Sequence, residues 1–121
     1  SYWKEVFGVT HGVMIASAFY ERVDRNGASV ELKFQPQTGQ QMLVACLWSH
    51  WVGKNGEELY SFAAVTDEPP EEVAAAGHDR CIIPLKEKHL EAWLNPDGNL
   101  KQAYEILDDR ERPYYEHQLA A

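Results

Sequence analysis

The sequence predicts an α+β fold built from a strongly bent antiparallel sheet, or a partial barrel, with short peripheral helices. Two observations lead to this prediction. The first two-thirds of the chain consist of short apolar or alternating segments separated by turns, which is the pattern of consecutive antiparallel strands. The last third contains two short segments in which apolar residues recur at helical spacing. With 121 residues, the chain can bury about two-thirds of its unfolded surface, which suits a single core.

Four strands are expected before residue 67. Residues 12–19 are mostly apolar, whereas residues 29–34 alternate, with the apolar side chains on one face. Between them, Asn26-Gly27 predicts a tight hairpin turn, because both residues tolerate positive φ. Residues 42–48 are almost entirely apolar, which predicts a strand buried on both faces. The four expected strands are 12–19, 29–34, 42–48 and 59–66.

Short helices are expected in the remainder of the chain. Prolines at 69–70, two acidic residues and then Gly77 predict a helix between them, because each residue type is favoured at that end of a helix. A short strand is expected at 81–84, and the charged tail from residue 108 is expected to wrap the surface. Apolar stripes predict two more helices, one with Leu90, Trp93 and Leu94 on one face and one with Leu100, Ala103, Tyr104 and Leu107 on one face.

The net charge of −8 is unevenly distributed. Residues 1–66 hold 5 basic and 6 acidic side chains, whereas residues 67–121 hold 6 basic and 13 acidic ones. An acidic surface repels phosphate, which argues against indiscriminate binding of nucleic acid. A local, nearly neutral cleft that accepts a few nucleotides is compatible with this distribution.

Other classes of protein and site are disfavoured. No apolar run approaches the ~20 residues that cross a bilayer, and no signal peptide opens the chain, so we expect a cytoplasmic protein without a membrane partner. Cys46 and Cys81 both lie in apolar runs, which predicts buried thiols rather than a disulfide. His78 and Cys81 are three positions apart, but a second pair at ligand spacing is missing, so we expect no metal and no other cofactor.

Two residues are candidates for acid–base chemistry. Glu21 follows the first apolar run, where a carboxylate at a strand end can reach a cleft; the alternative is a solvent-facing Glu paired with Arg22 or Arg25. His78 precedes Asp79-Arg80, and an adjacent acid can fix its tautomer while the Arg holds a phosphate. The alternative is a structural His beside a surface ion pair.

The remaining candidates stay open at this point. Cys81 could act as the nucleophile of a peptidase, but its place in an apolar strand favours a small buried hydrophobe. Trp48 and Trp51 could stack on nucleobases or serve as core and rim aromatics, and the sequence does not decide between these roles.

Four motifs follow one another in a distinctive order. They are an apolar strand that ends in Phe19-Tyr20-Glu21, the strand Ala45-Cys46-Leu47-Trp48, the pair Val65-Thr66, and His78-Asp79-Arg80 after a short helix. This order resembles the SOS response-associated peptidase (SRAP) family, and the likeness covers roughly residues 10–95.

The resemblance implies a protein that recognises abasic sites in single-stranded DNA and forms a covalent DNA–protein crosslink there. The family's nucleophile is a cysteine directly after the initiator Met, which closes a thiazolidine ring on the opened sugar. By the same resemblance, Glu21 would be the acid–base residue near the sugar and His78 would assist ring opening and proton transfer. Thr66 and Arg80 would contribute to the DNA cleft.

The chain also departs from the family pattern. It starts Ser1-Tyr2-Trp3, so the Met-Cys-Gly-Arg start is absent, as is the segment that carries the family's active-site Asn. We therefore expect residues 1–121 to be a single domain segment resembling the second part of an SRAP domain, inactive alone and with the remainder of the same domain as its partner. An unpaired sheet edge and exposed apolar surface are expected where that remainder packs.

Two other functions remain alternatives. A non-catalytic DNA-binding or regulatory module is suggested by Arg22, where the family usually has Trp, and by the acidic second half. A cysteine peptidase with autoprocessing activity is suggested by the family name.

One expectation is geometric. If Glu21 and His78 act together, the end of the first strand and the residue after the short helix must converge on one cleft. Their side chains should then approach to roughly 3–6 Å, and Thr66 should border the same cleft.

Overall fold

The structure, a computed structural model, describes residues 2–120. The elements, in chain order, are the 3-10 helix η1 (Tyr2–Glu5), the strands β1 (His11–Ala16), β2 (Phe19–Arg25), β3 (Ala28–Pro36), β4 (Met42–Val52), β5 (Glu58–Ala64) and β6 (Thr66–Asp67), helix α1 (Glu71–Ala76), strand β7 (Cys81–Ile82), the 3-10 helix η2 (Glu87–His89), helices α2 (Leu90–Leu94) and α3 (Leu100–Asp108), and strand β8 (Tyr115–Leu119).

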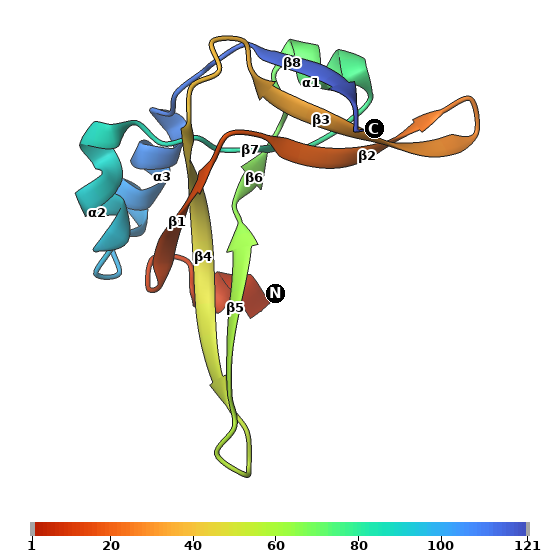
Figure 1. The fold of residues 1–121 in the computed structure, drawn as a ribbon. Helices are drawn as coiled ribbons and strands as arrows, with labels where there is room; N and C mark the ends of the chain where they lie inside the picture. The colour runs from red at the N-terminus through yellow and green to blue at the C-terminus, as the bar shows by residue number, and fades with distance from the viewer. Residues whose placement is uncertain (1, 121) are drawn as a thin grey trace.

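The strands form two three-stranded antiparallel sheets and one small two-stranded sheet. The first sheet has the order β1-β4-β5 and the second β2-β3-β8, while β6 pairs with β7. Figure 1 shows the second sheet crossing the end of the first at a steep angle, with α2 and α3 on one side of β4. The predicted α+β class is confirmed: the sheets are bent and not closed into a barrel.

The sharp bend accounts for two errors in the predicted strands. Residues 12–19 do not form one strand, because β1 ends at Ala16 and Phe19 starts β2 in the other sheet. The predicted strand 59–66 is likewise divided, since Val65 separates β5 from β6 and donates its backbone N–H to Ala45. A continuous apolar pattern does not reveal such a change of sheet, because the apolar residues on both sides of the break look alike in the sequence.

The predicted turn between β2 and β3 is confirmed. Asn26 has φ 54° and Gly27 has φ 82°, the pair of positive values that a two-residue hairpin turn requires. This turn fixes the register in which Glu21 lies opposite Leu32 and Val23 opposite Val30.

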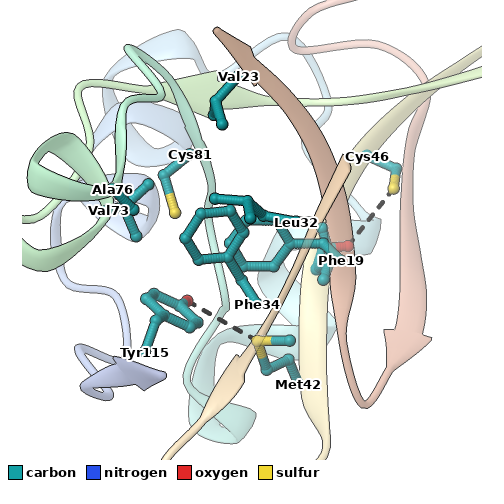
Figure 2. Packing of buried hydrophobic residues seen from close by; sticks show 11 residues of the cluster. Phe19, Val23, Leu32, Phe34, Met42, Cys46, Val73, Ala76, Cys81 and Tyr115 are labelled. Carbon is teal, nitrogen blue, oxygen red and sulfur yellow. Dashed lines mark hydrogen bonds between the residues drawn. The ribbon is translucent and has the colours of Figure 1, made fainter. Parts of the chain in front are cut away.

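Two clusters of apolar side chains hold the elements together. The first lies between the two sheets and α1, and Figure 2 shows Phe19, Leu32 and Phe34 at its centre. The second lies between the first sheet and the helices, with Trp93 fully buried and its Nε1 donating to the backbone oxygen of Gly12 at 2.9 Å. The sheet β1-β4-β5 therefore has a core on each of its faces.

The C-terminal third differs in detail from the prediction. The predicted helix 86–94 is a 3-10 turn followed by α2, and Leu94 is exposed. In α3 the buried side chains are Ala103, Ile106 and Leu107. The predicted apolar face was therefore right for Ala103 and Leu107 but wrong for Leu100 and Tyr104, which are exposed. None of the helices within residues 2–120 is long and apolar enough to cross a membrane.

The tail was predicted to wrap the surface, and this prediction was wrong for its last part. Strand β8 pairs with β3, and Tyr115 is buried in the first cluster. This strand forms because β8 pairs with the edge of β3 that β2 does not occupy. The sequence did not predict it, because a charged segment with one buried tyrosine has too weak a period-2 pattern.

Candidate functional site

Glu21 lies within β2 on the side of the strand that faces the core. It alternates with Phe19 and Val23, both buried in the first cluster, so its side chain points the same way as theirs. Its side chain is 30% exposed. The Glu21 side chain thus lies at the edge of the core and is only partly exposed to solvent.

His78 is positioned by the end of α1. Gly77 ends that helix with φ 108°, a left-handed conformation, and a Cβ atom there would lie 3.4 Å from Val23. Glycine therefore permits the left-handed backbone turn, and this turn sets the close approach of the loop to β2. This approach brings His78 to the edge of β2 beside Glu21.

The predicted meeting of the two side chains is confirmed. His78 Nε2 lies 3.0 Å from Glu21 Oε2, although the residues are 57 positions apart. The alternative pairing of Glu21 with Arg22 or Arg25 is not what the structure has, and Arg25 instead donates to the backbone oxygen of Ala76 at 2.9 Å.

The other nitrogen of His78 connects the pair to Arg80 and Thr66. His78 Nδ1 lies 2.8 Å from the backbone oxygen of Arg80 and 3.2 Å from its backbone nitrogen. Arg80 in turn donates through Nε to Thr66 Oγ1 at 3.2 Å and through Nη2 to the Thr66 backbone oxygen at 2.6 Å. The structure thus brings all four predicted site residues into one connected group, which we call the Glu21–Thr66 chain. The surface ion pair of Asp79 with Arg80, which belonged to the alternative interpretation of His78, is absent from the ion pairs of residues 2–120.

This arrangement can hold and move a proton. The Nε2 atom faces a carboxylate, and the Nδ1 atom can donate to the Arg80 carbonyl oxygen or accept from the Arg80 N–H. The imidazole and the carboxylate thus lie at a separation suited to general acid–base chemistry. Sequence reasoning missed that a backbone atom of Arg80 orients the imidazole, because every residue offers such an atom.

Cys81 follows the chain but is not placed as a nucleophile. Figure 2 shows its sulfur pointing into the first cluster, and desolvation, together with the nearby Glu72 and Glu21 carboxylates, raises the pKa of the thiol to about 12. A buried thiol of this kind is almost never a thiolate near neutral pH. The interpretation of Cys81 as a small buried hydrophobe fits this environment. Within residues 2–120, no three His, Cys, Asp or Glu side chains group as metal ligands would.

A hollow of about 490 Å³ lies beside the small β6–β7 sheet, and it is acidic. Its only ion pair among the described residues joins Asp67 to Arg110 at 2.8 Å, and the hydrogen bond from Arg110 holds the pKa of Asp67 below its usual value. The excess of acid makes it a poor site for phosphate groups. The acidic lining consists of Asp67, Glu68, Glu72, Asp108 and Glu111.

Solved structures with the same fold were found by comparison of the coordinates. A protein from Bordetella bronchiseptica superposes with a TM-score of 0.76 at 19% identity, over 98% of this chain and 58% of that one. A protein from Bacteroides thetaiotaomicron gives 0.75 at 14% identity, over 96% and 51%. A phage-related protein from Bordetella bronchiseptica gives 0.69 at 23% identity, over 98% and 56%. The chain thus spans between half and three-fifths of the length of these structures.

Comparison of the sequence with curated proteins found no match. Comparison with family models found one that covers residues 1–120, described as SOS response associated peptidase (SRAP). This match agrees with the motif order and extends the resemblance from residues 10–95 to nearly the whole chain. The chain belongs to the SRAP family.

Proposed function

We propose that the protein binds single-stranded DNA and forms a covalent crosslink at abasic sites. Membership of the SRAP family connects it with the SOS response and hence with DNA damage. The observation that supports the finer proposal is the Glu21–His78 contact of 3.0 Å, held within the Glu21–Thr66 chain. Such a protein would act in the cytoplasm, as the sequence suggests.

In this proposal each member of the chain has its own task. Glu21 and His78 exchange a proton with the sugar, because one sits at hydrogen-bond distance from the other and both are partly open to solvent. Arg80 uses Nε and Nη2 on Thr66, which leaves Nη1 to donate to a phosphate or sugar oxygen. Thr66 holds the guanidinium in that orientation.

The nucleophile would come from outside these 121 residues. In the crosslink, the aldehyde of the opened sugar condenses with the α-amine and thiol of an N-terminal cysteine, forming one C–N and one C–S bond and releasing one water. The remainder of the domain would carry this cysteine. Among residues 2–120, no further strand pairs with the outer edges of β1 and β5, and apolar side chains such as Ile15 are exposed. Both observations support the idea that another segment packs on the first sheet.

A denaturing gel tests the proposal. The intact protein is incubated with a single-stranded oligonucleotide that contains one abasic site, and a shifted band is expected. His78→Ala and Glu21→Gln should slow its formation, by roughly 100-fold if general acid–base catalysis is lost. The matched control is His89→Ala, since His89 also contacts a carboxylate, with Nε2 2.8 Å from Asp109, but lies at the end of η2, outside the Glu21–Thr66 chain. No band from a protein whose N-terminal cysteine is intact would exclude crosslinking.

The same gel separates the proposal from its alternatives. A non-catalytic module would bind abasic and intact strands alike and release both at high salt, without a covalent band. A peptidase that used Cys81 would react rapidly with a thiol probe at neutral pH, which the burial of that thiol argues against.

A further inference from the structure

The β4–β5 hairpin extends well beyond the body of the domain. The pairing of β1 with β4 stops at His11 and Leu47, and beyond that point β4 pairs only with β5. Figure 1 shows this hairpin projecting away from the second sheet and the helices. We call its two strands, residues 48–52 and 58–62, the arm.

One face of the arm carries a row of aromatic rings, here called the aromatic row. Trp48 lies opposite Phe62 and His50 opposite Tyr60. The rings of His50 and Tyr60 are stacked, with centroids 4.4 Å apart and an interplanar angle of 10°. Tyr60 and Phe62 are 58% and 61% exposed. The row is therefore ordered by its own contacts and still open to solvent.

A glycine shapes the base of the row. A Cβ atom at Gly12 would lie 3.0 Å from Phe62 and 3.5 Å from Trp48. A side chain at position 12 would therefore displace the Phe62 ring by a few tenths of an ångström. Glycine at this position lets Phe62 lie close against β1.

The aromatic row faces the same side as the Glu21–Thr66 chain. Side chains alternate along β4, so Trp48 and His50 share the face of Val44 and Cys46, which pack in the first cluster. Glu21 shares its face of β2 with residues of that same cluster. Both therefore border the angle between the two sheets, and Figure 1 shows β2 and β5 running along the two sides of that angle.

We propose that the aromatic row is a stacking platform for the nucleobases that flank the sugar held at Glu21 and His78. This inference rests on the proposed function. Side chains on one face of a strand repeat every ~6.8 Å, about twice the ~3.4 Å rise per stacked nucleotide, so a base can lie between successive rings. Base–aromatic stacking does not depend on sequence, which suits a protein that must accept any context around a lesion.

Charge on the arm does not oppose this occupant. His50 Nε2 lies 2.9 Å from Glu58 Oε1, at hydrogen-bond distance from that carboxylate at the outer end of the row. The excess acid of the protein lies in residues 67–121, and the arm belongs to the nearly neutral residues 1–66. Single-stranded DNA is therefore repelled less on this face than at the acidic hollow.

The test compares the two faces of the arm. Tyr60→Ala and Phe62→Ala remove rings from the row, while the matched controls Trp51→Ala and Leu59→Ala remove side chains of similar exposure, 54% and 56%, from the opposite face. Binding of the intact protein to a labelled oligothymidine and to a backbone of equal length made of tetrahydrofuran abasic analogues, which have no aldehyde and cannot crosslink, is measured by anisotropy. The row variants should weaken binding of oligothymidine by roughly 5- to 150-fold and leave the abasic backbone nearly unaffected. The controls should change neither.

Several outcomes would overturn the platform. The platform is refuted if variants on both faces of the arm lose affinity for oligothymidine equally. It is also refuted if a folded Phe62→Leu variant, which keeps the apolar area without the ring, binds oligothymidine as well as the wild type does. A wild-type dimer that Tyr60→Ala converts to monomer in light scattering would show that a second copy occupies the row. If the wild type crosslinks abasic DNA and no row substitution changes binding, only the platform is refuted. If the wild type neither binds nor crosslinks, the proposed function is refuted as well.

Discussion

Lowering the pH from 7.5 to 5.5 is expected to destabilise the protein through His11. This side chain is 4% exposed and stacks on Trp93 with ring centroids 3.8 Å apart. Its Nε2 accepts from the backbone N–H of Gly8 at 2.8 Å, so Nδ1 must be the atom that donates to the Trp93 oxygen, also at 2.8 Å. The neutral ring satisfies both contacts. A second proton would sit on Nε2, which would then be a donor and could no longer accept from the Gly8 N–H.

Desolvation lowers the pKa of His11 below its ordinary value of 6.5, and the hydrogen bond to Trp93 offsets only part of this. The unfolded chain therefore binds a proton more readily than the folded one. The contribution of the neutral His11 ring to the free energy of unfolding is fully present above its unfolded-state pKa of 6.5. This contribution is lost as the pH falls from 6.5 toward the lower pKa of the folded state. Between pH 7.5 and 5.5 the loss has a ceiling of about 1.4 kcal/mol, reached when the folded protein takes up no proton.

Urea denaturation of the wild type and His11→Gln at both pH values measures this loss. Gln keeps a hydrogen-bonding side chain but does not titrate, so carboxylates and other histidines contribute equally to both proteins. At pH 7.5 the variant should be less stable by about 1–3 kcal/mol, because the buried Gly8 and Trp93 groups lose well-placed partners. That difference should shrink at pH 5.5. A difference that stays constant or grows on acidification would refute the reasoning.

Three further predictions concern stability and reactivity. Leu32→Ala should lower the free energy of unfolding by about 2–5 kcal/mol in urea denaturation, whereas Leu119→Ala, at its exposed cross-strand neighbour, should change it by less than about 0.5 kcal/mol. Because burial raises the pKa of Cys81 to about 12, its reaction with a disulfide reagent at pH 7 should be more than about a thousandfold slower than that of a free thiol; fast labelling of the folded protein would contradict this. Asn99 caps α3 by accepting from the Gln102 N–H at 3.0 Å, so Asn99→Ala should cost about 1 kcal/mol, and an unchanged urea midpoint would show that the cap is dispensable.

Several features of the protein follow from local sequence alone. The Asn26-Gly27 turn, the end of α1 at Gly77 and the strand around Leu32 were all predictable, because φ preference and period-2 alternation are properties of neighbouring residues. The distribution of charge was predictable as well. It correctly marked the half of the chain that supplies all the acidic residues lining the hollow.

The meeting of Glu21 with His78 came from a resemblance and not from periodicity. The tertiary structure brings it about: Gly77 lets the loop after α1 touch Val23, and the register set at residues 26–27 determines which residue of β2 lies beside it. The role of the Arg80 carbonyl oxygen could not be predicted for the same reason, because the order of residues does not specify which backbone atom faces a ring.

Only the tertiary structure decided where the chain changes sheet and how the tail ends. The breaks at residues 17–18 and at Val65, and the pairing of β8 with β3, depend on contacts between residues far apart in sequence. Trp48 shows the same limit, since its face of β4 is set by alternation but its exposure depends on β1 starting only at His11, opposite Leu47. Local sequence determines which conformations a segment prefers, whereas distant partners determine which of its faces remain open.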